Sequence, residues 1–191
     1  PIIVLVHPQM GENIGAAARV MANFGLSTLR LVAPRDGWPN PAAETMAVGA
    51  FDHVQVSLFE DVPAATQDVH VTFAACGLAR GFNKRVLTGR GAATEARALA
   101  NEGKGSAILF GSERTGLDTD VIARASAVMT YPVEAGFSSL NLAQAVAVFA
   151  HEWRADAGPP PGFVQPWESP PATRAEIDGL IDHVLAEVTD A

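Results

Sequence analysis

Short apolar runs alternate with helical stretches over most of the chain. The run from Ile2 to Val6 is continuously apolar, as in a strand buried on both faces, and a stretch of small residues with helical spacing follows it. Asn13 is expected to cap this helix, and Gly25 to end it before a second strand at Thr28 to Val32. The chain therefore opens with a strand, a helix and a second strand.

The same alternation continues as far as Arg154. Further strands are expected at His53 to Leu58, Val69 to Ala74, Ala107 to Phe110 and Ala127 to Val133. Further helices are expected near Glu44 to Ala50, Asp61 to Thr66, Ala92 to Asn101, Asp120 to Ala125 and Ser139 to Arg154. Strands separated by helices predict an α/β fold with a mainly parallel sheet flanked by helices on both faces. Ligands of such sheets bind beyond the carboxyl ends of strands, so the loops after strands are the expected place for chemistry.

The C-terminal part has a different pattern. Prolines are dense from Gly158 to Pro171, which predicts a linker. Apolar residues then recur at helical spacing and predict an amphipathic helix; they are Ile177, Leu180, Ile181, Val184, Leu185 and Val188. The predicted organisation is a domain over 1–157, a linker over 158–171 and a helix over 172–191 that is either an appendage or the start of a longer extension. The apolar face is expected to pack on its own domain, on a second subunit or on a further segment.

Composition narrows the classes of function. With 48 % hydrophobic and 18 % charged residues, the 191-residue chain suits a folded domain. No apolar run is long enough to span a bilayer and no charged leader precedes one, so a soluble, cytoplasmic protein without a membrane partner is expected. The single cysteine, Cys76, excludes an intrachain disulfide, and the histidines lack the spacing of metal ligands, so no metal is expected.

Charge is unevenly distributed along the chain. The net charge of −8 argues against a protein that coats nucleic acid with its whole surface, because phosphate binding depends on lysine and arginine. The segment from Cys76 to Gly91 nevertheless contains no acidic residue and four cations, Arg80, Lys84, Arg85 and Arg90. It is either a solvated basic loop or a site of contact with a polyanion.

Three loops that follow predicted strands have unusual residues. The first, HPQMGENIGAAAR, leads into the helix that contains Arg19, the one charged residue between Asn13 and Gly25. The second, ILFGSERTGLD, leaves its strand at Gly111. The third, YPVEAGFSSLNLAQAV, reaches Ser139 before an apolar helix. Taken singly, these asparagines, serines and glycines are ordinary helix caps and turn residues.

Several common enzyme motifs are not present. The segment GSERTG has the wrong spacing for a dinucleotide-binding fingerprint, and GENIG lacks the lysine and hydroxyl of a phosphate-binding loop. No G-x-S-x-G sequence occurs, and His151-Glu152 has no second histidine at helical distance. The sequence therefore does not support nucleotide hydrolysis, NAD binding, acyl transfer or metal-dependent hydrolysis.

In these three loops the chain resembles the SPOUT superfamily of RNA methyltransferases, in its SpoU/TrmH branch. The branch is marked by N-x-G-x-x-x-R, F-G-x-E-x-x-G-L and S-L-N-x-x-x-A-x, present here as NIGAAAR, FGSERTGL and SSLNLAQAV. The resemblance covers Ile2 to Arg154 and implies a SPOUT α/β fold with a C-terminal trefoil knot and a homodimer.

The implied activity is methylation of a ribose 2′-hydroxyl in tRNA, in the anticodon loop at a site of the position 32 type. S-adenosyl-L-methionine is the implied methyl donor and S-adenosyl-L-homocysteine the product, without a metal. Two alternatives stay open: an rRNA 2′-O-methyltransferase of the same family, and a non-catalytic RNA-binding module that has kept the fold.

The resemblance also implies which residues form the site. The cofactor-binding set is Gly77, Leu78, Ala79, Gly111, Tyr131, Ser138, Ser139 and Leu140. The catalytic set is Arg19, Asn13, Glu113, Ser139 and Asn141. Gly77 and Leu78 stand where the family usually has threonine and serine, so a side-chain hydroxyl contact is missing there while backbone contacts are retained.

Arg19 has the most specific implied role, which is to reach the methyl donor of the other subunit. The 2′-oxygen becomes negative as it attacks the methyl group, and a guanidinium stabilises that charge. Because its pKa lies above about 12, Arg19 is not the base, and an RNA phosphate or a water is the better proton acceptor. Gly15 and Ala16, one turn earlier, are expected to leave room for the ribose.

The resemblance also implies a function for the basic segment, the stretch from Cys76 to Gly91. It leaves the cofactor loop directly, so it is expected to guide RNA phosphates past the methyl donor, with Phe82 as a platform for a base. Arg114 is expected to add to this surface.

Overall fold

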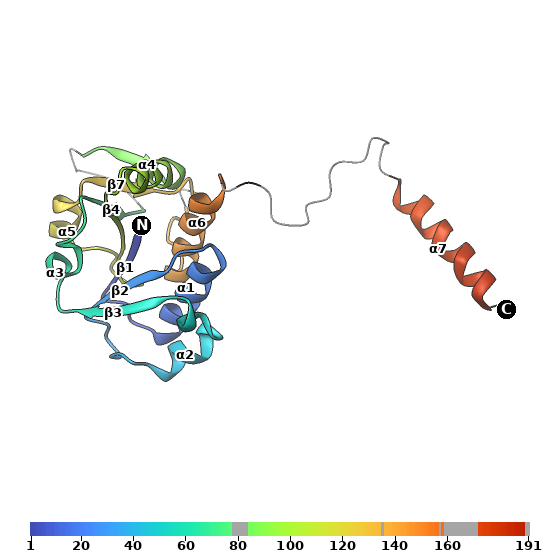
Figure 1. Cartoon of the computed structure of the whole chain (residues 1–191), viewed down its shortest axis with the longest axis horizontal. Helices are drawn as coiled ribbons and strands as arrows, with labels where there is room; N and C mark the ends of the chain where they lie inside the picture. Colours follow the sequence, from blue (N-terminus) through green and yellow to red (C-terminus); the bar gives the residue numbers. More distant parts are fainter. Residues whose placement is uncertain (78–83, 135, 157, 159–171, 190–191) are drawn as a thin grey trace. The chain divides into compact units, whose positions relative to one another are not determined.

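The computed structural model of the chain describes residues 1–77, 84–134, 136–156, 158 and 172–189. The chain divides into two compact units, Pro1–Ala157 and Gly158–Ala191 (Figure 1). Apart from Gly158, the predicted linker lies outside the described residues. Among the helices in the described ranges, none has the length and apolar character needed to cross a bilayer.

The first unit is built on a sheet of seven strands in the order β3-β2-β1-β6-β4-β7-β5. All neighbouring strands are parallel. The strands are β1 (Ile2–Val6), β2 (Thr28–Val32), β3 (Gln55–Phe59), β4 (Val71–Ala75), β5 (Val86–Thr88), β6 (Ser106–Phe110) and β7 (Ala127–Thr130). The predicted parallel α/β sheet is confirmed, and the central strands β1, β6 and β4 are the most apolar because both of their faces are covered.

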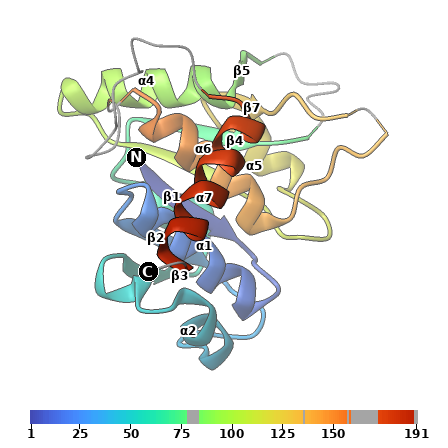
Figure 2. The same ribbon diagram turned by 90° about the vertical axis from the view of Figure 1, so that its right-hand side faces the viewer.

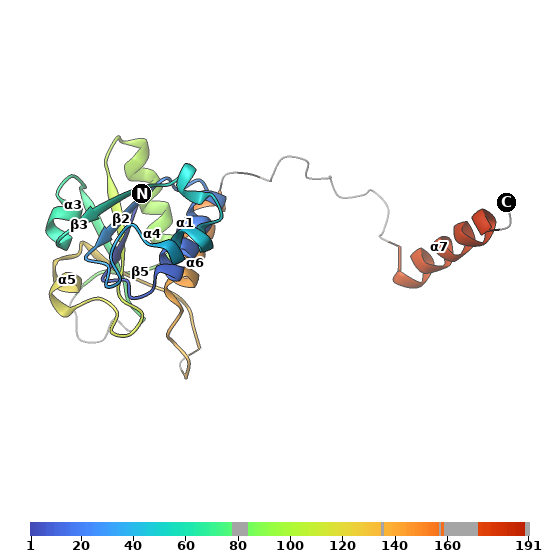
Figure 3. The ribbon, with the colours of Figure 1, turned by 90° about the horizontal axis from the view of Figure 1, so that it is seen from below.

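Helices cover both faces of this sheet, as predicted. They are α1 (Gly11–Asn23), α2 (Pro41–Ala47), α3 (Val62–Thr66), α4 (Gly89–Asn101), α5 (Thr119–Arg124) and α6 (Leu142–Arg154), with a 3₁₀ helix η1 (Ala50–Asp52) after α2. The long helices α1, α4 and α6 pack on one face. The short helices α3 and α5 lie on the other (Figures 1 and 3).

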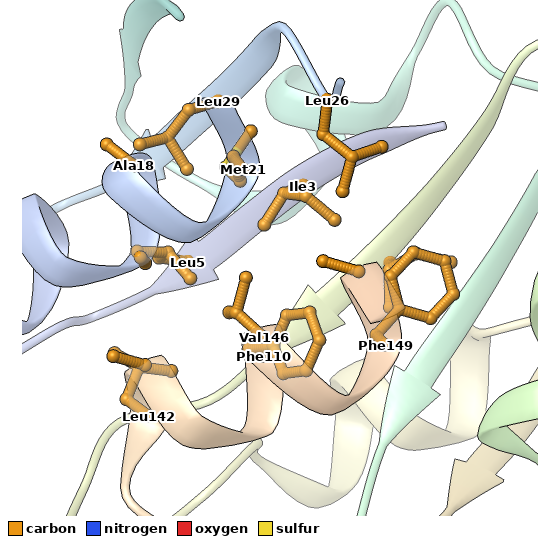
Figure 4. Close-up of a cluster of buried hydrophobic side chains, with 14 of the residues drawn as sticks. Ile3, Leu5, Ala18, Met21, Leu26, Leu29, Phe110, Leu142, Val146 and Phe149 are labelled. Carbon is orange, nitrogen blue, oxygen red and sulfur yellow. The ribbon is translucent and has the colours of Figure 1, made fainter. Parts of the chain in front are cut away.

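The larger part of the core lies between the sheet and the long helices. Ile3, Met21, Phe110 and Phe149 are among its fully buried side chains (Figure 4). Gly15 brings α1 against α2, since a Cβ at this position would lie 2.1 Å from the carbonyl oxygen of Ala43. Gly15 is thus buried under α2, and the expectation that it leaves room for a ribose is wrong.

Two predicted helix caps are also wrong. The helix α1 begins at Gly11, two residues before Asn13, and the Asn13 side chain bonds to other segments instead. Ser139 precedes α6, whose cap is Asn141, with its side-chain oxygen 2.9 Å from the backbone nitrogen of Ala143. The predicted end of α1 is confirmed, because Gly25 follows it with a φ of 74°.

Other element boundaries shift because the tertiary structure supplies new partners. Residues Val86–Thr88, predicted as part of a basic loop, form the edge strand β5 beside β7. A three-residue strand has too few positions to show alternation, so the sequence carries no signal for it. The strand β7 ends at Thr130, before the predicted Val133, and α2 ends at Ala47, before the predicted Ala50.

The second unit contains the helix α7 (Arg174–Thr189). It starts with a capping box, in which the Thr173 backbone N–H and hydroxyl donate to a Glu176 carboxylate oxygen at 2.6 and 2.8 Å. These bonds hold the pKa of Glu176 below its ordinary value. The six apolar side chains that define the predicted amphipathic face are exposed within this unit, from Ile177 at 40 % to Val188 at 72 %.

Candidate functional site

A cavity of about 370 Å³ lies at the carboxyl ends of β4, β6 and β7. These three strands are neighbours or next neighbours in the sheet, so their exit loops meet at one edge. Its lining comes from those loops and the first turn of α6, and comprises Ala75, Cys76, Gly77, Phe110, Gly111, Ser112, Glu113, Arg114, Thr115, Gly116, Tyr131, Val133, Ser138, Ser139, Leu140, Leu142 and Ala145. The position agrees with the expectation that ligands bind beyond the carboxyl ends of parallel strands.

Glycine shapes the loop after β6. A Cβ on Gly111 would lie 2.0 Å from the backbone carbon of Gly116 and 2.2 Å from the nitrogen of Leu117, so no other residue fits this turn. Ser112 and Gly116 form an isolated antiparallel bridge, and the Ser112 and Thr115 hydroxyls are 2.7 Å apart. The turn is therefore closed on itself and presents a preformed backbone wall to the cavity.

Glu113 is the centre of a polar network that joins the three motif loops. Its carboxylate accepts hydrogen bonds from the backbone N–H of Gln9 at 2.8 Å, the backbone N–H of Met10 at 3.3 Å and the side-chain amide of Asn13 at 2.7 Å. The side-chain amide of Asn141 donates to Asn13 Oδ1 at 3.0 Å. Residues separated along the chain are thus held in one arrangement at the edge of the sheet.

Two members of this network lie away from the cavity. Neither Asn13 nor Asn141 is among the described residues that line the cavity, and Asn13 is only 8 % exposed. Asn141 also caps α6. Of the predicted catalytic residues, only Glu113 and Ser139 reach the cavity wall.

Tyr131 forms one wall of the cavity and bonds to α6. Its hydroxyl donates to the backbone oxygen of Ala145 at 2.7 Å. Burial raises the pKa of Tyr131 far above its ordinary value, so the phenol stays neutral. Gly89 packs against the ring, because a Cβ there would lie 2.7 Å from a Tyr131 ring carbon. Tyr131 is therefore a rigid wall and not a proton carrier near neutral pH.

Arg19, unlike Asn13 of the Glu113 network, lies on the exposed surface of the protein. It is exposed on α1, and no described residue forms a hydrogen bond or ion pair with its guanidinium. It does not line the cavity of its own subunit. Any partner of this charge therefore comes from outside the described residues.

Most of the predicted cofactor-binding residues gather at the cavity. Those that line it are Gly77, Gly111, Tyr131, Ser138, Ser139 and Leu140. The other two predicted residues, Leu78 and Ala79, lie outside the described residues, as do Arg80 and Phe82 of the basic segment.

The described cations of the basic segment are bonded within the chain. Lys84 donates to the backbone oxygen of Ala125, and Arg85 pairs with Glu95 at 2.8 Å. Arg90 pairs with Glu152 at 2.9 Å, which raises the pKa of Arg90. This part of the segment is thus less available to phosphates than its composition indicates, whereas Arg114 is exposed at the cavity.

Sequence reasoning missed several residues of the site. Phe110, Val133 and Ala145 line the cavity with apolar surface, and such residues look like ordinary core positions in a sequence. Ser112 and Thr115 stabilise the turn that contains Glu113. Their position between the two glycines of GSERTG was the signal available for them.

Residues 1–151 of the chain match the family model described as the SpoU rRNA Methylase family. The chain belongs to this family. The α/β architecture of this SpoU protein agrees with that assignment, because solved methyltransferase structures share its fold. The trefoil knot stays a prediction.

The names of individual relatives describe a narrower activity than the family description does. A tRNA (cytidine/uridine/adenosine-2′-O-)-methyltransferase TrmJ from Pseudomonas aeruginosa (strain UCBPP-PA14) is 32 % identical over 169 residues, 83 % of this chain and 63 % of the relative. A crystal structure of TrmJ from Z. mobilis ZM4 is 44 % identical with a TM-score of 0.74, covering 100 % of this chain and 80 % of that one.

A further solved structure, described as giving insights into the 2-OH methylation of C/U34 on tRNA, is 28 % identical. Its TM-score is 0.63, and the match covers 79 % of this chain and 91 % of that one. The SpoU chain spans less than two thirds of the length of the first curated relatives it matches, 66 % and 63 %.

Proposed function

We propose that this SpoU protein transfers a methyl group from S-adenosyl-L-methionine to a ribose 2′-hydroxyl of tRNA. The observation that carries the proposal is the network in which Glu113, Asn13 and Asn141 join all three family motifs beside one cavity. The choice of tRNA as the substrate and of the ribose 2′-oxygen as the methyl acceptor rests on the relatives named TrmJ.

The cavity fits the methyl donor in size and chemistry. Its volume of about 370 Å³ is within the usual range of small-molecule sites, roughly 300 to 1,000 Å³. Val133 and Leu140, which line the cavity and are partly exposed, offer apolar surface to a purine, while the turns at Gly77 and Gly111 place backbone groups near its polar edges. When bound, S-adenosyl-L-methionine supplies an electrophilic methyl group. The residues proposed to hold it are Gly77, Leu78, Ala79, Gly111, Tyr131, Ser138, Ser139 and Leu140.

Arg19 is proposed to stabilise the negative charge that develops on the 2′-oxygen. Ser139 and Glu113, on the cavity wall, are proposed to help orient the ribose and the loop against it. The proton of the hydroxyl passes to an RNA phosphate or a water, since a guanidinium stays protonated. Holding the oxygen in line with the methyl carbon and the sulfur is the remaining requirement.

The active form is proposed to be a homodimer in which Arg19 serves the cavity of the second subunit. Arg19 lies on α1, which packs between α2 and α6 (Figure 2). Exposed apolar side chains occur on or beside all three helices: Met10 before α1, Met46 on α2 and Val148 on α6. Exposed apolar side chains on these packed helices, together with an arginine that has no ion pair among the described residues, suit a subunit interface.

The proposed target is the tRNA anticodon loop, at a nucleotide of the position 32 type. The structure described for C/U34 methylation offers a second candidate nucleotide. A trefoil knot in the fold and a cytoplasmic location are further parts of the proposal. They rest on the family assignment and on the RNA substrate.

Incubation with labelled methyl donor and with purified tRNA or rRNA tests this function. We expect label in tRNA alone, and mass spectrometry of ribonuclease fragments is expected to find a 2′-O-methylated anticodon-loop nucleotide. Label in rRNA alone would favour the second candidate, an rRNA methyltransferase, which the family description supports. RNA binding without heat of binding for the methyl donor would overturn catalysis in favour of an RNA-binding module.

A further inference from the structure

Phe137 has the largest exposed fraction of all large apolar side chains in the described ranges, 83 %. The other phenylalanine, tyrosine and tryptophan side chains in those ranges are partly or fully buried. Trp38, for example, lies edge-on against Phe51, with 5.2 Å between the ring centroids. Because single apolar residues are common on protein surfaces, exposure alone assigns no function, and the surroundings of Phe137 must indicate what covers its ring.

Phe137 lies at the rim of the cavity, in the segment between β7 and α6 that extends away from the sheet (Figure 3). The next two residues, Ser138 and Ser139, line the cavity, whereas Phe137 is not among the lining residues. The Phe137 backbone N–H donates to the backbone oxygen of Glu134 at 3.0 Å. A Cβ on Gly77 would lie 3.4 Å from the backbone oxygen of Ser138, so this segment passes close to the loop after β4. The ring therefore lies in solvent beside the cavity mouth, outside the space proposed for the methyl donor.

A cation lies on another wall of the same cavity. Arg114 lines the cavity from the turn after β6 and is exposed. It forms no ion pair with any described residue, whereas Arg85 and Arg90 are both paired. The adjacent carboxylate of Glu113 already accepts three hydrogen bonds. The cavity mouth thus has an exposed guanidinium and an exposed aromatic ring on two different loops.

We propose that Phe137 is a stacking platform for an unpaired base of the RNA substrate, and that Arg114 contacts a phosphate of the same strand. The proposal rests on the proposed function, because it takes the cavity to hold the methyl donor. Proteins that bind single-stranded RNA combine the same two groups: aromatic side chains that stack on bases, and cations that pair with the backbone. The two contacts hold a loop nucleotide across the cavity mouth, where its 2′-hydroxyl meets the methyl group.

A base fits the surroundings of Phe137 better than a second subunit does. Its neighbours Gly136, Ser138 and Ser139 are small or polar, whereas the core of a subunit interface is a more continuous apolar surface. A stacked base covers one face of the ring and keeps its own polar edges in water. A single phenyl ring among serines is sufficient for that contact.

Fluorescence anisotropy of end-labelled tRNA with the full chain, at constant salt and without methyl donor, tests the platform. For Phe137→Ala we expect about tenfold weaker binding, because one base loses its stacking partner. Phe137→Trp keeps an aromatic face and is expected to bind within about twofold of wild type. Phe137→Leu keeps only apolar surface and is expected to bind as weakly as Phe137→Ala.

The matched control is Leu58→Ala, which removes an exposed apolar side chain from β3. It is expected to bind tRNA within about twofold of wild type. Calorimetry is expected to find the same affinity for S-adenosyl-L-methionine in Phe137→Ala and wild type, because the ring lies outside the cavity. Thermal unfolding is also expected to be unchanged, since the ring is exposed.

Salt dependence distinguishes the two proposed contacts. Arg114→Ala is expected to weaken tRNA binding and to lower the slope of log Kd against log salt concentration by about one, because one phosphate contact is lost. Phe137→Ala is expected to keep the wild-type slope, because stacking releases no counterions. A wild-type slope in Arg114→Ala would overturn the phosphate contact.

The platform would be overturned by wild-type tRNA affinity in Phe137→Ala, or by an equal loss of affinity in Leu58→Ala. Sedimentation that finds fewer dimers in Phe137→Ala would overturn it too, by assigning the ring to a subunit contact. Failure of the proposed function gives a different result: the wild-type protein binds tRNA but transfers no label, and the Phe137→Ala effect on binding remains. A wild-type protein that binds no tRNA would overturn both proposals.

Discussion

Asn13 and Arg19 lie on the same helix, α1, and belong to the same family motif, yet their surroundings are opposite. Asn13 is almost fully buried and bonds to both Glu113 and Asn141. Arg19 is exposed and has no ion-pair partner in the described part of the subunit. The comparison separates a side chain that is bonded within its own subunit from a charge that has no bonding partner among the described residues.

The largest expected effect is on activity and comes from Arg19→Ala. Loss of charge stabilisation is expected to lower methyl transfer about 10³-fold, or roughly 4 kcal/mol of barrier. The melting temperature and the affinity for the methyl donor are expected to stay unchanged, because no described residue forms a hydrogen bond or ion pair with Arg19. Single-turnover methyl transfer, calorimetry and thermal unfolding measure the three quantities.

Arg154→Ala is the matched control for this variant, since Arg154 is an exposed arginine on the neighbouring helix α6. It is expected to transfer methyl groups at the wild-type rate. Full activity in Arg19→Ala would show that Arg19 is an ordinary solvated surface residue with no role in methyl transfer.

The next largest effect is expected from Glu113→Gln and falls on stability. This change keeps the shape of the side chain but replaces charge-assisted hydrogen bonds to two backbone N–H groups and to Asn13. We expect a loss of about 2 to 3 kcal/mol in the free energy of unfolding, measured with urea, and a weaker affinity for the methyl donor.

A double-mutant cycle with Asn13→Ala sharpens this result. Because the two side chains share a hydrogen bond, the cost of Glu113→Gln is expected to be smaller in the Asn13→Ala background. Strictly additive costs would show that the pair does not act as a unit. If Asn13 and Arg19 differ as described, Glu113→Gln lowers the stability of the protein and Arg19→Ala does not.

The smallest effect is expected from Tyr131→Phe. Loss of the hydroxyl bond to Ala145 is expected to cost about 1 kcal/mol of stability. Burial raises the Tyr131 pKa, so above about pH 10 an unfolded tyrosine loses its proton while the folded one keeps it. Wild-type stability should therefore fall as the pH rises above this value, and this contribution should vanish in the variant. Unfolding curves from pH 8 to 11 measure it, and an unchanged pH dependence would contradict a buried, neutral phenol.

The periodicity of the sequence predicted most of the fold but not its finer boundaries. Alternation of apolar runs and helices is a local signal, and it located β1, α1 and β2 correctly. The edge strand β5 was missed because three residues carry no period. Asn13 was misassigned as a cap because asparagine serves equally well as a cap and as a partner for a distant side chain, and only the position of Glu113 distinguishes the two.

The sequence by itself determined the alternation of strands and helices, apart from the edge strand β5, and the presence of the three family motifs, since both depend on neighbours along the chain. Only the tertiary structure decided what the motif residues contact. Asn13 donates a hydrogen bond to Glu113, 100 residues later in the sequence. Gly15 packs against α2 so closely that a larger side chain does not fit. Such features depend on contacts between distant segments, and hydrophobic periodicity contains no information about them.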